Sequence, residues 1–167
     1  MSFIDSLLHK AFGSPHDRKV KQLRPVIAKI HQYREEIKEI DDAELALKTN
    51  QLKEKLEKSK NLDDIRVEAF AVCQEACDRR LGVFNIFNPE HHFDFSQLDE
   101  DLQAVAKQAK AELEAGKPEH EVYLPARLYA KVRELYPESV KPFRMMPFDV
   151  QMIGGLVLHE GSIAEMA

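Results

Sequence analysis

Apolar residues recur at intervals of three and four positions along most of the chain, which is the pattern of helices that bury one face. Short polar stretches rich in Gly, Pro, Ser, Asp and Asn separate these segments, and such residues commonly begin or end helices. The pattern predicts a mostly α-helical protein, with helices over about 3–12, 15–40, 42–58, 62–82, 97–115, 125–136 and 147–160.

Several residues should fix the helix ends. Ser14 is expected to cap one helix, and Pro15 suits its first position because the N–H that proline lacks is not needed there. Pro25 lies inside the same apolar pattern, so it should kink this helix or mark its true beginning. Asp41 and Ser96 are each followed three residues later by an acid, which predicts a cap at both positions.

The C-terminal stretch combines a helix, a stop and a strand. Gly161 should close the helix over 147–160, and the residues after it predict a short strand over 162–166. Gly154 and Gly155 lie inside the helix, where each costs about 1 kcal/mol relative to alanine. We therefore expect the backbone there to pack closely against a neighbouring element.

The helical period is lost between residues 83 and 95. Four phenylalanines occur there among Asn, Pro and His residues, which predicts an irregular connection that buries its aromatic rings: Phe84, Phe87, Phe93 and Phe95. The adjacent His91 and His92 lie beside two acids, but they lack the cysteine or His-x-x-x-His partners of a metal site. No metal site is therefore expected.

Composition narrows the class of protein. The 167 residues suit one domain, and the net charge of −5 argues against nucleic-acid binding. The average conceals a basic segment, in which seven basic residues between positions 10 and 34 face the single acid Asp17. This segment is typical either of a surface that meets an anionic partner, such as lipid headgroups or another subunit, or of an ordinary solvated helix face.

No apolar run approaches the ~20 residues that a membrane span requires. The N-terminus also lacks the features of a signal peptide, so the chain is expected to be cytoplasmic. Cys73 and Cys77 lie four residues apart on a predicted helix. Because a metal or a disulfide would need partners that the sequence does not show, we expect two reduced thiols in the apolar core.

Four segments resemble, in the same order, segments of the SecA preprotein translocase ATPase family. They are 12–18 (Phe-Gly-Ser-Pro-His-Asp-Arg), 42–56, 68–82 and 148–167. The last is similar to the adenine-recognition (Q) motif of that family and the first strand of its motor domain. In the family, a glycine-rich phosphate-binding loop ending in Gly-Lys-Thr comes next, and this chain is expected to end just before that loop.

The resemblance implies a binding site for the adenine base of ATP. Gln151 would be the nucleotide-binding glutamine, since a carboxamide can pair in two places with adenine N6 and N7. The alternative is an ordinary exposed glutamine. Phe148 would lie against the base or anchor the core. Met145 and Met146 occupy positions that line the base in the family, and soft thioethers suit an aromatic face.

The resemblance also implies the domain organisation. In most members the glycine that matches Gly82 runs almost directly into the Q motif, whereas residues 83–143 intervene here. We expect an N-terminal helical region over 1–82, an inserted helical hairpin over 83–143, and the start of a RecA-like α/β motor domain over 144–167. The insertion would lie next to the adenine pocket and alter its wall.

The function implied is the N-terminal part of a motor that uses ATP to move preproteins through a SecYEG-type membrane channel. The chain itself should bind adenine weakly and carry no catalytic residue, because it lacks the loop that holds the phosphates and Mg²⁺. Implied partners are preprotein, channel, anionic phospholipid at the basic helices and a second copy, with no nucleic acid. The implied location is peripheral, on the cytoplasmic side of the bacterial inner membrane.

Two alternatives remain. The chain could be a non-enzymatic helical module for docking or dimerisation through its basic amphipathic front end. It could also belong to another Q-motif ATPase, such as a helicase, although the segments 12–18 and 42–56 argue against that class.

Overall fold

The computed structural model describes residues 15–137 and 139–165, and within these ranges it contains helices and no strand. The α-helices are α2 (Pro15–Ile37), α3 (Asp42–Ser59), α4 (Asp63–Cys77), α5 (Glu100–Glu114), α6 (Ala126–Leu135) and α7 (Asp149–His159). Short 3₁₀ turns cover Val83–Phe87, Pro89–His91, Phe95–Gln97 and Glu119–Glu121. The prediction of a mostly α-helical protein is confirmed.

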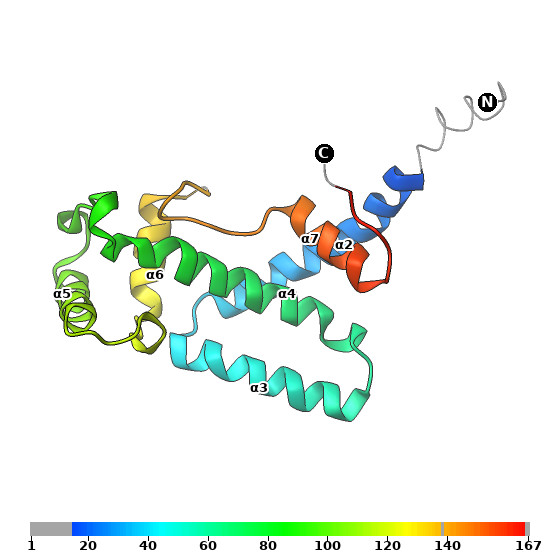
Figure 1. Cartoon of the computed structure of the whole chain (residues 1–167), viewed down its shortest axis with the longest axis horizontal. Helices are drawn as coiled ribbons and strands as arrows, with labels where there is room; N and C mark the ends of the chain where they lie inside the picture. The colour runs from blue at the N-terminus through cyan, green and yellow to red at the C-terminus, as the bar shows by residue number, and fades with distance from the viewer. Residues whose placement is uncertain (1–14, 138, 166–167) are drawn as a thin grey trace, which may run out of the picture.

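Helix α4 is the central element of the molecule (Figure 1). It contacts α2 along one side and α3 along another, and α7 packs on α2. Helices α5 and α6 lie together at the far end of α4, away from α7. No helix in the described ranges is both long enough and apolar enough to cross a membrane.

Two hydrophobic cores form at the two ends of α4. The first joins α2, α3, α4 and α7, through Leu23, Ile27, Ile30, Ile37, Leu45, Ala71, Met152 and Leu156. The second draws all its buried residues from the segment between Val83 and Phe143. Its phenylalanines contact one another, and the rings of Phe93 and Phe143 meet edge to face at 5.2 Å. The expected aromatic connection is therefore a buried cluster.

Local signals placed several helix ends correctly. The described part of α2 begins at Pro15, and it runs through Pro25, which is therefore not its beginning. The Asp41 side chain accepts a hydrogen bond from the Glu44 N–H at 3.0 Å and so caps α3. The cap predicted at Ser96 is wrong, because Ser96 lies in a 3₁₀ turn and α5 begins only after Asp99.

The helix that contains α4 continues into a wider, π-helical turn. This turn, Asp78–Gly82, follows α4 directly, so the continuous helix ends at Gly82 as expected. Gly82 passes very close to the segment after Phe143, since a Cβ placed on it would lie 2.6 Å from the Met145 nitrogen. The two ends of the segment 83–143 are therefore neighbours in space.

The expectation of close packing at the glycine pair is met at Gly155. A Cβ on that residue would lie 3.0 Å from the ring of Phe70 in α4, so the missing side chain lets α7 approach the aromatic ring. This contact helps to seat α7 on the first core.

Two expectations need correction. Residues 162–165 do not form the expected strand, since a strand needs a neighbouring strand and the described residues contain none. Cys73 is exposed and Cys77 half-buried, although both are free thiols as expected. Gln74 and Glu75 occupy the buried face of α4, so the cysteines lie nearer its exposed face. The helix predicted over 3–12, the cap predicted at Ser14 and residue 166 lie outside the described residues.

Candidate functional site

The residues expected to recognise adenine line one pocket. Met145, Met146, Phe148 and Gln151 border a cavity of about 250 Å³, together with Cys77, Leu81, Ser139, Lys141, Arg144 and Pro147. Ligand pockets for whole small molecules usually occupy ~300–1,000 Å³. The cavity therefore suits one part of a ligand, such as a planar base.

Gln151 lies in the first turn of α7, and its side chain is held at the helix start. Its Oε1 accepts a hydrogen bond from the Phe148 N–H at 2.9 Å, which is one half of a capping box. The Nε2 donates to no group in the described part of the chain. Because a carboxamide oxygen accepts two hydrogen bonds, Gln151 can still offer one donor and one acceptor to a ligand.

Apolar side chains form the open rim of the pocket. Phe148 is 60% exposed, so it does not anchor the core, which was one of its two expected roles. Leu81 borders the same cavity and is 55% exposed. Met145 and Met146 are half-buried in the wall. This rim offers flat and soft apolar surfaces to an aromatic ligand.

Hydrogen bonds from α4 and the following turn hold the segment that carries these residues. The Gln74 Nε2 donates to the Pro147 carbonyl at 3.2 Å, and the Asn85 Nδ2 donates to the Pro142 carbonyl at 2.9 Å. Cys77 reaches the pocket from α4, and burial together with the nearby Cys73 raises the pKa of its thiol. Cys77 is therefore a neutral wall residue at neutral pH.

A cluster of buried charges lies beneath the pocket. Asp78, in the π-turn, has no solvent exposure. Its carboxylate pairs with Arg144 through Nε at 2.9 Å and Nη2 at 3.2 Å, with Arg34 at 2.8 Å and with Arg133 at 3.1 Å. These arginines come from α2, from α6 and from the segment before α7. One carboxylate thus joins three parts of the chain.

Glu75, one turn earlier on α4, is equally buried and extends the cluster. It accepts from Arg79 at 2.7 Å, from Arg133 at 2.6 Å and from Arg34 at 3.1 Å. Burial alone would lower the pKa of Arg133, but Glu75 and Asp78 raise it above its ordinary value. The guanidinium therefore stays charged.

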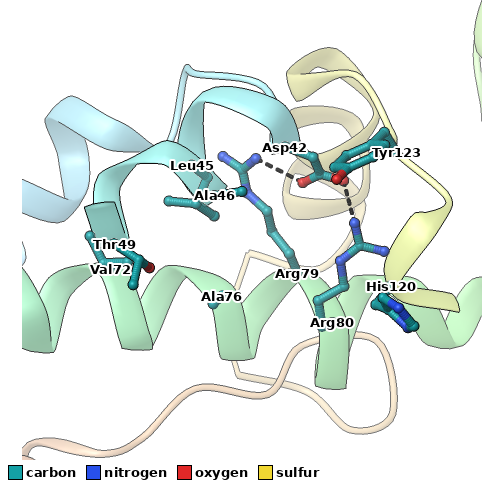
Figure 2. Close-up of a pocket in the computed structure, with 10 residues that line it drawn as sticks. All are labelled: Asp42, Leu45, Ala46, Thr49, Val72, Ala76, Arg79, Arg80, His120 and Tyr123. Carbon is teal, nitrogen blue, oxygen red and sulfur yellow. Dashed lines mark hydrogen bonds and ion pairs between the residues drawn. The ribbon is translucent and has the colours of Figure 1, made fainter. Parts of the chain in front are cut away.

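Asp42, at the start of α3, is the third buried carboxylate of the cluster and lies next to α6. Figure 2 shows its carboxylate between Arg79 and Arg80, at 3.1 and 2.7 Å. It also accepts from the Leu124 N–H at 3.0 Å and from the Tyr129 hydroxyl at 2.7 Å. Burial and this carboxylate raise the pKa of Tyr129 far above its usual range. The phenol is therefore a permanent donor.

The cluster was not expected from the sequence. Among the described residues, five arginines surround the three carboxylates Asp42, Glu75 and Asp78. The only local signal is the spacing of Glu75, Asp78 and Arg79, which share one helix face but resemble a solvated stripe. Buried charges of this kind cost desolvation energy and fix geometry, so the cluster specifies how the segments meet.

His91 packs in the aromatic connection, whereas the neighbouring His92 is exposed. The ring of His91 lies edge-on to Phe143 at 6.3 Å. Within the described residues no three His, Cys, Asp or Glu side chains are grouped to hold a metal ion.

The sequence matches the model of a known protein family over most of its length. The model of the SecA DEAD-like domain matches residues 8–98 and 90–167. The chain belongs to the SecA family. It is 31% identical over 159 residues to the protein translocase subunit SecA of Synechococcus sp. (strain JA-2-3B'a(2-13)), covering 95% of this chain and 10% of that protein.

Other SecA relatives give the same picture. The protein translocase subunit SecA of Chromobacterium violaceum is 31% identical over 163 residues, covering 98% of this chain and 11% of that protein. That of Clostridium novyi (strain NT) is 48% identical over 77 residues, covering 46% of this chain and 9% of that protein. The chain spans about a tenth of the length of these relatives, and no solved structure matches it.

Proposed function

We propose that this chain is the N-terminal part of a protein translocase motor, and that the pocket at the start of α7 binds the adenine base of ATP. The observation that carries the proposal is the meeting of Met145, Met146, Phe148 and Gln151 around one cavity. The free Nε2 of Gln151 and the exposed ring of Phe148 supply the donor and the stacking surface that a purine needs.

ATP hydrolysis would be a property of the longer protein. The sequence contains no Gly-Lys-Ser/Thr loop to hold phosphates and Mg²⁺, so this chain alone would recognise the base without hydrolysing the nucleotide. In the longer protein, hydrolysis would drive preproteins through a SecYEG-type channel. Val150 and Leu158 of α7 are 63% and 62% exposed, which supports a further part of the motor covering this helix.

The basic helix α2 supports a peripheral membrane location. Arg18, Lys21 and Lys29 are exposed, on the side of α2 opposite the buried Leu23 and Ile27. Each basic residue near an anionic membrane contributes about 1 kcal/mol to binding. This face would meet anionic phospholipid on the cytoplasmic side of the inner membrane, the channel, or a second copy of the protein.

The division of the chain into 1–82, 83–143 and 144–167 belongs to the same proposal. The second core takes its buried residues from within 83–143, and Gly82 touches residues 143–145. An insertion needs ends that meet in this way. The family model matches this chain in two separate pieces, 8–98 and 90–167, which overlap inside this region.

Replacing Gln151 with alanine tests the proposal. In the full-length protein that carries these residues, we expect Q151A to reduce the preference for ATP over GTP by about 5- to 150-fold, since a paired carboxamide supplies roughly 1–3 kcal/mol of base discrimination. Competition against a fluorescent ATP analogue measures both affinities. Q108A, an exposed glutamine on α5, is the control and should leave the preference unchanged. An unchanged preference in Q151A would contradict the proposal.

A further inference from the structure

We infer that the end of the inserted segment completes the nucleotide pocket, and that Lys141 contacts the phosphate-bearing side of the bound nucleotide. The inference rests on the proposed adenine site and adds to it the contribution of residues 139–141. Ser139 and Lys141 line the same cavity as Gln151, Phe148 and the two methionines. The insertion is thus part of the pocket wall and not only its neighbour.

This wall is fixed in place by several contacts. The Asn85 carboxamide bridges the Leu81 and Pro142 carbonyls at 2.7 and 2.9 Å, which joins the beginning of the insertion to its end. Phe143 is buried in the aromatic cluster. The wall therefore has a defined position relative to the Q-motif helix, and its side chains can act as part of a preformed site.

The Arg144 guanidinium secures the same wall from below. It pairs with Asp78, donates from Nη1 to the Tyr136 carbonyl at 2.6 Å, and shares Asp78 with Arg133 of α6. Because its donors are used in this way, Arg144 holds the wall and does not serve as the cation for a ligand.

Lys141 is the remaining cation among the described residues that line the pocket. Its side chain is exposed and forms no ion pair with any described residue. A flexible ammonium group at the open side of a base pocket attracts phosphate oxygens, whereas an uncharged nucleoside offers it nothing comparable. The ligand class that this wall favours is therefore a purine nucleoside phosphate over the free nucleoside.

Charge reversal at Lys141 tests the inference in the full-length protein. We expect K141E to weaken ATP binding by about 5- to 10-fold at low salt, and K141A by less, as for an exposed charge contact. Adenosine binding should be unchanged, and the loss for ATP should shrink at high salt because exposed charges are screened. Displacement of a fluorescent ATP analogue by ATP and by adenosine gives both affinities.

The control is K107E, which reverses an exposed lysine on α5 of the same insertion and should leave ATP binding unchanged. Equal ATP affinities in K141E and the unmodified protein, or equal losses for ATP and adenosine, would overturn the inference. Q151A separates it from the proposed function. If Q151A weakens both ligands and K141E weakens neither, the inference alone fails; if Q151A also has no effect, both fail.

Discussion

Replacing Asp78 with alanine is expected to lower the free energy of unfolding by about 3–5 kcal/mol, which is the usual cost of breaking a buried ion pair by removing one partner. The substitution takes away the carboxylate that Arg34, Arg133 and Arg144 share. Glu75 would still pair with Arg34 and Arg133, whereas Arg144 would keep no carboxylate partner among the described residues. Urea-induced unfolding, followed by circular dichroism, measures the change.

An exposed ion pair provides the matched control. Asp101 pairs with Arg127 at 2.8 Å, and the two side chains are 56% and 71% exposed. Because solvent screens such pairs, D101A should cost less than about 1 kcal/mol. Similar costs for D78A and D101A would show that the cluster does not hold the segments together.

A methyl group at Gly82 is expected to cost about 3 kcal/mol of stability, at the upper end of the range for overpacking. The Cβ of an alanine would lie 2.6 Å from the Met145 nitrogen and 3.2 Å from the Phe143 oxygen. Backbone atoms cannot rotate away as a side chain can, so the segment 143–145 must move. Urea unfolding of G82A measures the cost.

Gly155 offers the comparison, because its close neighbour is a side chain. An alanine there meets the Phe70 ring at 3.0 Å, and the ring can shift. Alanine also favours the helix by about 1 kcal/mol relative to glycine. G155A should therefore change stability by no more than about 1 kcal/mol, and a larger loss than in G82A would contradict the packing described.

The helices could be predicted from the sequence because their signals are local. Asp41 defines a helix start through its own side-chain chemistry, and the structure confirms this cap. Pro15 is the first described residue of α2, so its place at the helix start stays a prediction. The prediction at Ser96 was wrong because it also used only local residues. The residues around Ser96 resemble a cap, but this stretch packs on the aromatic cluster and forms a 3₁₀ turn.

The buried cluster of charged residues could not be predicted from the pattern of apolar and polar positions. The partners of Asp78 lie 44, 55 and 66 residues away in the chain, so no local window contains the cluster. Sequence rules assign charged residues to the surface and small apolar residues to the interior. They therefore predicted that Cys73 is buried in the core. The structure reverses this assignment.

Some residues of the candidate site could be predicted from the sequence, and others could not. The resemblance named four residues that lie close together in sequence, and the structure gathers them around one cavity. Leu81, Ser139 and Lys141 were missed because they reach the pocket only when Gly82 and residues 143–145 come together. That contact depends on how the whole segment 83–143 folds.

The most direct measurement is methyl NMR of the full-length protein with ¹³C-labelled methionine, titrated with ATP. Met145 and Met146 line the proposed base site, whereas Met152, on the buried face of α7, belongs to the first core. We expect ATP to shift the methyl signals of Met145 and Met146, GTP to shift them less at the same concentration, and the Met152 signal to stay in place. Signals of Met145 and Met146 that do not move at saturating ATP would contradict it.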